Sequence, residues 1–339
     1  MDMRILLTFF VLLGCLSLAQ QPDPLLSENP KLQQKWVDSV YQSLSLDQKI
    51  GQLFTPMVFS KKEDDHFDEI KNLIEKYHIG GIIFSLGVPV KQSQWLNEFQ
   101  SLSKVPLLIS MDAEWGVAMR LDSVVAFPWS MTLGAIKDND IVRKIGQRMG
   151  EQEKILGVHM SYAPVLDINT NPQNPIIGNR SYGEDPYRVA EKGVALMQGH
   201  HDAGILTSGK HFPGHGDTAN DSHKTLPTVD FDRSRLEKIE ILPFKKAIEQ
   251  GLSSVMTAHL NIPALTSSNE PTSLSHAVVT ELLKQKIGFN GLAVTDALNM
   301  KGAEPIDSDT NIDLLALLAG NDVLLISKDI PLGIESIKN

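Results

Sequence analysis

Short apolar runs alternate with helical patterns along almost the whole chain, and this alternation restricts the fold more than any other feature of the sequence. The apolar runs cover residues 53–59, 80–84, 106–110, 160–165, 205–208, 254–258, 292–295 and 323–326. Helical patterns separate them, at residues 64–77, 91–103, 138–156, 185–203, 232–251, 276–286 and 312–319, and two more precede the first run. Strands that are apolar at consecutive positions are typical of a parallel sheet buried on both faces. Eight such units in 339 residues predict an α/β fold, a (β/α)8 TIM barrel, as one domain over residues 31–339.

The first residues have the pattern of a secretory signal. A positively charged start precedes the apolar residues 5–13, and residues 17–19 resemble a cleavage site. We expect a signal peptide over residues 1–19, a flexible leader over 20–30, and export to the periplasm or outer surface of a bacterium. Alternatively, Cys15 ends a lipoprotein-like box and becomes a lipid-anchored amino terminus. The apolar run is too short to span a membrane stably.

The net charge and the cysteine content limit which partners and which chemistry we expect of this chain. The net charge is -10 and no basic cluster occurs, which argues against nucleic acid as a partner. Cys15 is the only cysteine, so we expect no disulfide and no thiol chemistry in the folded domain. Only residues 327–339 follow the last predicted strand, and further C-terminal domains are therefore expected in a longer protein.

The segment 210–223 concentrates reactive side chains. It holds three His, two Asp and one Lys, interrupted by Pro213, Gly214 and Gly216. Because these residues break helices and central strands, the whole segment is predicted to be a loop between a strand and a helix. Loops at the carboxyl ends of barrel strands carry catalytic residues.

Polar residues follow five of the predicted strands, and a barrel brings such positions together at one mouth. They are Asp112, Glu114 and Arg120; Asp167 and later Arg180; Lys210 and His211; His259; and Asp296. Asp296 directly follows an apolar strand, which suits a rigidly held nucleophile that attacks the anomeric carbon of a sugar. Alternatively, Asp296 caps the following helix.

The loop offers two possible acid/base pairs. Asp221 and His223 are two residues apart, so both side chains can turn to one side of an extended segment and share a hydrogen bond. A neighbouring carboxylate favours the protonated imidazole, which could protonate a leaving oxygen and later deprotonate water. His215 and Asp217 have the same spacing and could serve instead, and either pair could also be ordinary loop residues.

A metal site is the main competing interpretation of the same loop. His211, His215, Asp217 and His223 offer enough imidazole and carboxylate groups for zinc. However, Pro213 and Gly214 prevent the first two histidines from sharing a helix face, and no HExxH string is present. We therefore expect no metal.

Residues 210–227 read K-H-F-P-G-H-G-D-T-x-x-D-S-H-x-x-L-P, which resembles the signature of glycoside hydrolase family 3, the bacterial β-N-acetylglucosaminidase (β-N-acetylhexosaminidase) type. The string has few free positions. The segments around Asp112, Arg180 and Asp296 occur in the family's order, so the resemblance extends over roughly residues 45–326.

The resemblance implies a retaining exo-hydrolase that removes terminal β-linked N-acetylhexosamine through a covalent glycosyl-enzyme, without a cofactor. Asp296 matches the family's nucleophile, and His223, assisted by Asp221, matches its acid/base. Sugar-binding positions are matched by Asp112, Arg120, Arg180, Lys210 and His211. The expected partner is a carbohydrate, from peptidoglycan fragments or related glycans.

The chain departs from the family pattern after the third predicted strand. The family commonly has Asp-x-Glu-Gly-Gly followed by Arg-x-x-Arg, whereas here Trp115 replaces the first glycine and only Arg120 remains of the pair. Trp115 could stack on a sugar or narrow the aglycone side. The alternatives to a hexosaminidase are a β-glucosidase or glycoside phosphorylase of the same family, and a non-catalytic carbohydrate-binding barrel.

Overall fold

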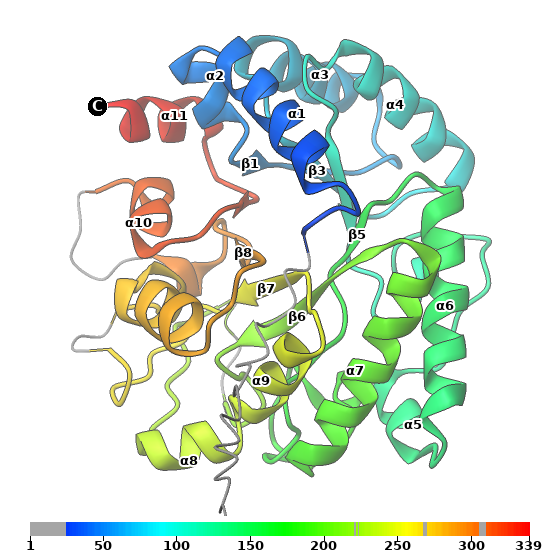
Figure 1. Ribbon diagram of the computed structural model, residues 1–339, viewed down its shortest axis with the longest axis vertical. Coiled ribbons are helices and arrows are strands. Elements are labelled where there is room, and N and C mark those ends of the chain that lie inside the picture. The colour runs from blue at the N-terminus through cyan, green and yellow to red at the C-terminus, as the bar shows by residue number, and fades with distance from the viewer. Residues whose placement is uncertain (1–24, 220–221, 223, 267–269, 305–309) are drawn as a thin grey trace, which may run out of the picture.

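Seven parallel strands form the central sheet of the protein, in the order β2-β3-β4-β5-β6-β7-β8. The computed structural model describes residues 25–219, 222, 224–266, 270–304 and 310–339 (Figure 1). The strands are β2 (Met57–Val58), β3 (Gly81–Phe84), β4 (Leu108–Met111), β5 (Met160–Ser161), β6 (Leu206–Phe212), β7 (Ser254–Thr257) and β8 (Leu292–Thr295). Two further strands, β1 (Phe54–Thr55) and β9 (Leu324–Leu325), form a separate parallel pair. All strand pairs are parallel, as the consecutive apolar positions predict.

The predicted α/β fold is confirmed as TIM-barrel-like, but the strands make a curled seven-stranded sheet and a separate pair instead of one closed ring of eight. The first predicted strand is divided because Pro56 separates β1 from β2 and has no amide hydrogen to donate. The β9 segment has hydrogen bonds on both sides. The amide of Leu324 donates to the Leu53 carbonyl at 2.8 Å, and the amide of Thr295 donates to the Val323 carbonyl at 3.0 Å.

Helices surround the sheet at nearly the predicted positions (Figure 1). They are α1 (Pro30–Ser43), α2 (Leu46–Gly51), α3 (Asp64–Tyr77), α4 (Pro89–Leu102), α5 (Ser130–Ala135), α6 (Asn139–Ile155), α7 (Pro186–Ala203), α8 (Arg233–Lys238), α9 (Leu242–Glu249), the wide-turn helix η4 (Ala277–Lys286), α10 (Ile312–Ala319) and α11 (Ile330–Lys338). The single helix predicted over residues 232–251 is wrong. Pro243 lies in the first turn of α9 and cannot donate a hydrogen bond to a preceding turn, so two short helices form there.

Strand β6 is longer than predicted, and this corrects the assignment of Lys210 and His211 to a loop. The strand continues through Phe212 and stops only at Pro213. Its register against β7 shifts between Gly209 and Phe212. Consecutive side chains of a regular strand point to opposite faces, and an irregularity of this kind can turn both toward one face. Lys210 and His211 accordingly both line the same pocket.

The inside of the sheet is filled by a compact apolar cluster. Its buried members are Ile83, Met160, Tyr162, Met256, Val294 and Leu325, contributed by five strands or the residues beside them. On the outer face, Phe212 at the end of β6 meets Phe244 of α9 edge to face, with ring centroids 5.3 Å apart. The sheet is therefore buried on both faces, which is the physical reason for its apolar strands.

Helix α1 lies at the end of the sheet opposite the strands' carboxyl ends. The ammonium group of Lys104, in the connection before β4, donates to the carbonyl of Ser43 at 2.8 Å. The helix predicted from residue 31 is confirmed, although its apolar side chains are mainly exposed, including Trp36 at 57%. No helix of the described residues is long and apolar enough to cross a bilayer. The predicted signal peptide, residues 1–19 with Cys15, lies outside the described part of the chain, which begins at residue 25.

Replacing Phe244 by Ala should lower the free energy of unfolding by about 3–5 kcal/mol, because the change empties a fully buried site between α9 and β6. Urea denaturation measures the change. The matched control is Tyr187→Ala on α7, where the aromatic side chain is 62% exposed and the expected change is within about 0.5 kcal/mol. Equal losses in the two variants would contradict the packing described for α9.

Candidate active site

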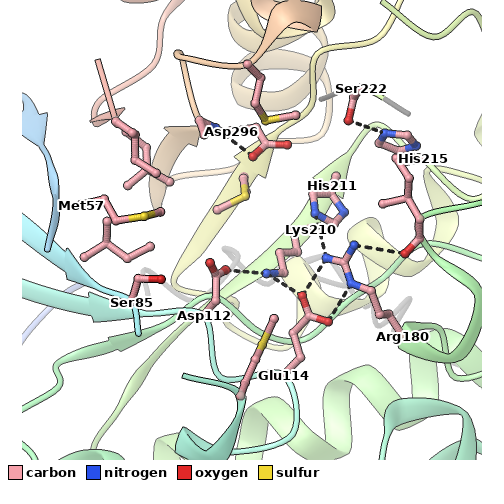
Figure 2. A pocket seen from close by; sticks show the side chains of 18 of the residues that line it. Met57, Ser85, Asp112, Glu114, Arg180, Lys210, His211, His215, Ser222 and Asp296 are labelled. Atoms are coloured by element: carbon pink, nitrogen blue, oxygen red, sulfur yellow. Dashed lines mark hydrogen bonds and ion pairs between the residues drawn. The ribbon is translucent and has the colours of Figure 1, made fainter. Parts of the chain in front are cut away.

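A pocket of about 440 Å³ opens at the carboxyl ends of the strands (Figure 2). It has an apolar floor from the interior of the sheet and a polar wall mainly from β6 and from the segments that follow β4, β5, β6 and β8. The apolar lining comprises Met57, Ile83, Met119, Ile176, Met256, Ala297, Met300, Leu325 and Ile326. The polar lining comprises Ser85, Asp112, Glu114, Arg120, Arg180, Lys210, His211, His215, Ser222 and Asp296. A few convergent polar groups over an apolar floor are typical of a site for a small polar ligand.

Lys210 joins two acidic residues on one wall of the pocket (Figure 2). Its Nζ lies 2.8 Å from Asp112 Oδ1 and 2.8 Å from Glu114 Oε1. Arg120 donates to the other oxygen of Asp112. Arg180 holds Glu114 with two hydrogen bonds, from Nη2 to Oε1 at 2.7 Å and from Nε to Oε2 at 2.9 Å. The side chains of Lys210 and Glu114 are only 3% and 1% exposed, so these charges are balanced inside the protein.

These ion pairs determine the protonation states of the acidic and basic side chains in the polar wall. Burial alone would raise the carboxyl pKa of Asp112 and Glu114, but Lys210, with Arg120 beside the first and Arg180 beside the second, lowers each pKa below its ordinary value. The same carboxylates raise the pKa of Lys210 in spite of its burial. Asp112 and Glu114 are therefore anionic at neutral pH and accept hydrogen bonds without supplying protons.

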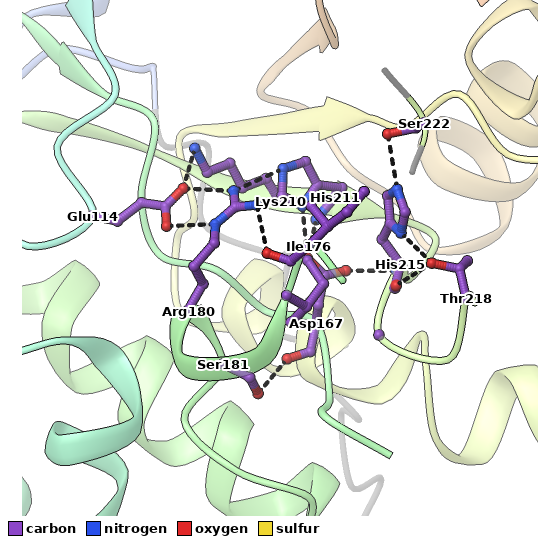
Figure 3. Close-up of polar contacts among 12 residues, drawn as sticks. Glu114, Asp167, Ile176, Arg180, Ser181, Lys210, His211, His215, Thr218 and Ser222 are labelled. Carbon is purple, nitrogen blue, oxygen red and sulfur yellow. Dashed lines mark hydrogen bonds and ion pairs between the residues drawn. The ribbon is translucent and has the colours of Figure 1, made fainter. Parts of the chain in front are cut away.

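Asp167 organises the start of the loop that follows β6 (Figure 3). Its Oδ2 lies 2.6 Å from His211 Nδ1 and accepts the His211 amide at 3.1 Å, and its Oδ1 accepts the His215 amide at 2.6 Å. Burial raises the pKa of the Asp167 carboxyl, but His211 outweighs this and the net shift is downward. An ionised Asp167 can only accept, so His211 Nδ1 carries the proton and Nε2 faces Arg180 at 3.4 Å.

His215 is a buried structural residue and does not form the alternative acid/base pair. Thr218 donates its hydroxyl hydrogen to the His215 carbonyl at 3.1 Å, so the same hydroxyl accepts from His215 Nδ1 at 2.8 Å. His215 Nε2 is then left to accept from Ser222, whose hydroxyl lies 3.0 Å away. Burial first, and then His211, lower the pKa of His215 to about 4. The proposed partner Asp217 instead pairs with Arg235 at 3.2 Å.

The metal interpretation gains no support from these contacts. His211 and His215 use their ring nitrogens for Asp167, Thr218 and Ser222, as described above. Within the described ranges, no group of three or more His, Cys, Asp or Glu side chains is placed to hold a metal ion.

Asp296 directly follows β8 and points into the pocket (Figure 2). Its Oδ1 accepts the amide of Ala297 at 2.8 Å, and its own amide donates to the Thr257 carbonyl at 2.9 Å. The carboxylate caps no helix, since the next helical turn, η5 (Lys301–Ala303), has Met300 at its N-cap. His259, after β7, lies with Nε2 3.1 Å from the Ala297 carbonyl and thereby supports this turn.

The carboxyl pKa of Asp296 is low for a buried acid. Burial raises it, but the nearby His211 and His259 rings, the Ala297 amide and Lys210 together lower it below the ordinary value. The side chain is therefore an anion at neutral pH, and it lines the pocket. A carboxylate in that state is suited to nucleophilic attack.

The structure gathers six of the eight predicted site residues: Asp112, Arg120, Arg180, Lys210, His211 and Asp296 all line the pocket. The other two, Asp221 and His223, lie outside the described residues. Glu114 and Asp167 each bind several of the functional groups, and their position after predicted strands does not indicate these roles. Asn174 was missed. Its side-chain amide donates to the carbonyls of His215 and Gly216 at 2.9 and 3.1 Å, and no sequence signal marks this long-range contact.

The chain matches known proteins over most of its length. Residues 45–339 match the family described as glycosyl hydrolase family 3 N terminal domain. The chain is 35% identical to the β-hexosaminidase A of Pseudoalteromonas piscicida over 281 residues, 76% of this chain and 47% of that protein. It is 33% identical to a β-hexosaminidase of Nitrosomonas eutropha over 261 residues, 74% of each. It thus spans about half the length of the first relative and about three quarters of the second.

Solved structures with a similar fold include a β-N-acetylglucosaminidase and a β-glucoside phosphorylase. A family 3 β-N-acetylglucosaminidase from Paenibacillus sp. str. FPU-7 superimposes with a TM-score of 0.80 at 38% identity, covering 87% of this chain and 57% of that one. The β-glucoside phosphorylase BglX bound to 2FGlc superimposes with a TM-score of 0.85 at 25% identity, covering 91% of this chain and 56% of that one.

Replacing Glu114 by Gln should destabilise the protein by about 3–5 kcal/mol at pH 7, because Lys210 and Arg180 then lose a buried counter-charge. The pKa of Glu114 is lowered by folding, so its contribution is complete above its unfolded pKa of about 4.5 and falls as the pH drops below that value. Urea titrations at several pH values should show the difference between variant and wild type shrinking in acid.

The exposed ion pair of Glu304 with Lys328 is the control for this experiment. Glu304→Gln should leave the free energy of unfolding unchanged within error, because exposed pairs contribute little. A Glu114→Gln protein as stable as wild type at pH 7 would contradict the buried network.

Proposed function

The chain belongs to glycosyl hydrolase family 3, and from this membership and the pocket geometry we propose that it is a retaining exo-β-N-acetylhexosaminidase. The single observation that carries the proposal is Asp296, an anionic carboxylate at the tip of β8 that faces the polar wall of Asp112 and Lys210. The proposed substrate carries a terminal β-linked N-acetylglucosamine or N-acetylgalactosamine.

In the proposed first step, an oxygen of Asp296 attacks C1 of the terminal sugar. The glycosidic C1–O bond breaks, and the leaving oxygen takes a proton from an acid, so a glycosyl-Asp296 ester and a free alcohol form. In the second step water attacks C1, gives a proton to the same group acting as a base, and releases Asp296. Asp112 accepts hydrogen bonds from ring hydroxyls while Lys210 and Arg180 donate them.

The acid/base is proposed to be His223, assisted by Asp221. The described pocket residues offer no better group: Asp112 and Glu114 are paired with cations, and His215 has a pKa of about 4 with both ring nitrogens engaged. His223 matches the family's acid/base in the resemblance, and it follows Ser222, which lines the pocket. An imidazole with a pKa near neutrality suits alternating acid and base roles.

The cellular location of the enzyme and the source of its substrates are also proposed from the sequence. The pattern of residues 1–19 supports export to a periplasm or outer surface, by cleavage near Ala19 or by lipidation at Cys15. An exported enzyme would meet peptidoglycan fragments or related glycans as substrates.

Phosphorolysis is the second candidate, because the phosphorylase BglX superimposes with a TM-score of 0.85. In that case phosphate replaces water in the second step and a sugar phosphate forms. Assaying the products with and without phosphate separates the two reactions: free N-acetylhexosamine as the sole sugar product supports hydrolysis, and an N-acetylhexosamine phosphate supports phosphorolysis.

Asp296→Ala should lower kcat on an aryl N-acetyl-β-glucosaminide by at least about 10⁴-fold while the protein remains folded, because Asp112 and Glu114, the other carboxylates of the described pocket lining, are paired with cations. The control is Asp202→Ala, which removes an exposed carboxylate paired with Arg143 on the surface. If Asp296→Ala kept the kcat of the wild-type protein, Asp296 would not be the nucleophile.

His223→Ala should slow the disaccharide of N-acetylglucosamine by about 10²–10⁴-fold and an aryl glycoside with a good leaving group far less, because only the former needs its leaving oxygen protonated. Steady-state kinetics on the two substrates measure the ratio. Equal losses on both substrates would contradict an acid role.

A further inference from the structure

Two tryptophan rings stack on each other in the segment that follows β4. The rings of Trp115 and Trp129 lie nearly parallel, with centroids 4.2 Å apart and an angle of 14°. Trp115 stands where the resembling family commonly has glycine, and Trp129 is the N-cap residue of α5. Trp129 is 45% exposed, so the pair presents a broad apolar surface that the core does not need.

The pair lies beside the wall of the pocket. The amide of Gly116 donates to the Ala113 carbonyl at 2.9 Å, which closes a tight turn with Glu114 and Trp115 as its two central residues. Glu114 is buried against Lys210, and the Cα atom of Trp115 is only about 3.8 Å from that of Glu114. The carbonyl of Trp115 accepts the amide of Phe127 at 3.2 Å, which ties the turn to the chain that leads into Trp129.

Neither ring lines the pocket that contains Asp296. The pocket volume, about 440 Å³, is at the small end of ligand sites. An exo-acting enzyme holds the terminal sugar over its nucleophile and leaves the remaining units outside. Those units must lie outside the pocket, and Trp115 directly follows Glu114, which lines the pocket, in the same tight turn.

We propose that Trp115 and Trp129 form a stacking platform for the leaving-group part of the substrate, and that this part is a β-linked oligosaccharide. This proposal rests on the glycosidase function proposed above. A β-linked pyranose carries axial C–H groups on its faces, and these are attracted to the electron-rich face of an indole ring. Because Trp115 braces one face of Trp129, the other face is held in place before the sugar arrives, which reduces the entropy lost on binding.

A second hollow at the same end of the sheet agrees with an extended ligand. It measures about 530 Å³ and is lined by Met131 of α5, two residues after Trp129, together with Asn169, Glu184, Asp185 and Arg188. These polar groups can bond sugar hydroxyls. Helix α5 thus carries an aromatic surface at its start and one wall of a polar hollow in its first turn.

The test compares Trp129→Ala and Trp115→Gly with wild type on methyl N-acetyl-β-glucosaminide and on β-linked N-acetylglucosamine dimers to pentamers. The methyl group is too small to reach the rings, so the ratio of kcat/KM on the tetramer to that on the methyl glycoside measures the platform. This ratio should fall about five- to tenfold in both variants. The matched control is Trp36→Ala, because Trp36 is 57% exposed on α1 at the opposite end of the sheet, and its ratio should equal that of wild type.

The outcomes separate this proposal from the one on which it rests. Wild-type hydrolysis of the methyl glycoside with a ratio unchanged in both Trp variants rejects the platform alone. A parallel loss on all substrates also rejects it, because that result indicates a structural role. No wild-type hydrolysis of any of these glycosides rejects the proposed function, and the platform with it. A blue shift of tryptophan fluorescence in Asp296→Asn on adding the tetramer, absent after Trp129→Ala, would support it independently.

Discussion

The ion pairs that Lys210 makes with Asp112 and Glu114 are the interaction on which the pocket depends. They connect the end of β4 with β6, 98 residues further along the chain, and place three charges where water hardly reaches. A buried charge is tolerated only with its partners, so the two strand ends are held in one arrangement. The register shift of β6 is part of the same arrangement, since it lets Lys210 reach Asp112 while His211 reaches Asp167.

Because of these ion pairs, different residues of the pocket are suited to sugar binding, nucleophilic attack and proton transfer. Asp112 and Glu114 are committed to cations and remain anionic, which suits recognition of hydroxyl groups and removes them as proton donors. Asp296 sits on a rigid strand end with a lowered pKa, as a nucleophile requires. The proposed mechanism assigns proton transfer to a different segment, and His215 and Asn174 hold the chain that leads to that segment. The proposed mechanism follows from this separation.

The sequence predicted the order and type of nearly all elements, because strands buried on both faces must be apolar at consecutive positions and the helices between them are amphipathic. It also predicted which strand ends converge. It failed at β6, where glycine and proline were expected to break the strand but Pro213 only ends it. It could not assign roles to Glu114, Asp167 or Asn174, because the functional groups that they bind lie 41 or more residues away and only folding brings them together. The sequence indicated only one member of the tryptophan pair, because Trp115 departs from the family pattern. The contact of Trp115 with Trp129 depends on the turn at Gly116 and could not be predicted.

The most direct test of the account is a crystal structure of Asp296→Asn with the β-linked disaccharide of N-acetylglucosamine. The account predicts that C1 of the non-reducing sugar lies about 3–3.5 Å from the side chain at position 296, with the ring hydroxyls bonded to Asp112 and Lys210. The second sugar should point out of the pocket toward Trp129. A disaccharide bound with its reducing end innermost, or without contact to Asp112 and Lys210, would contradict it.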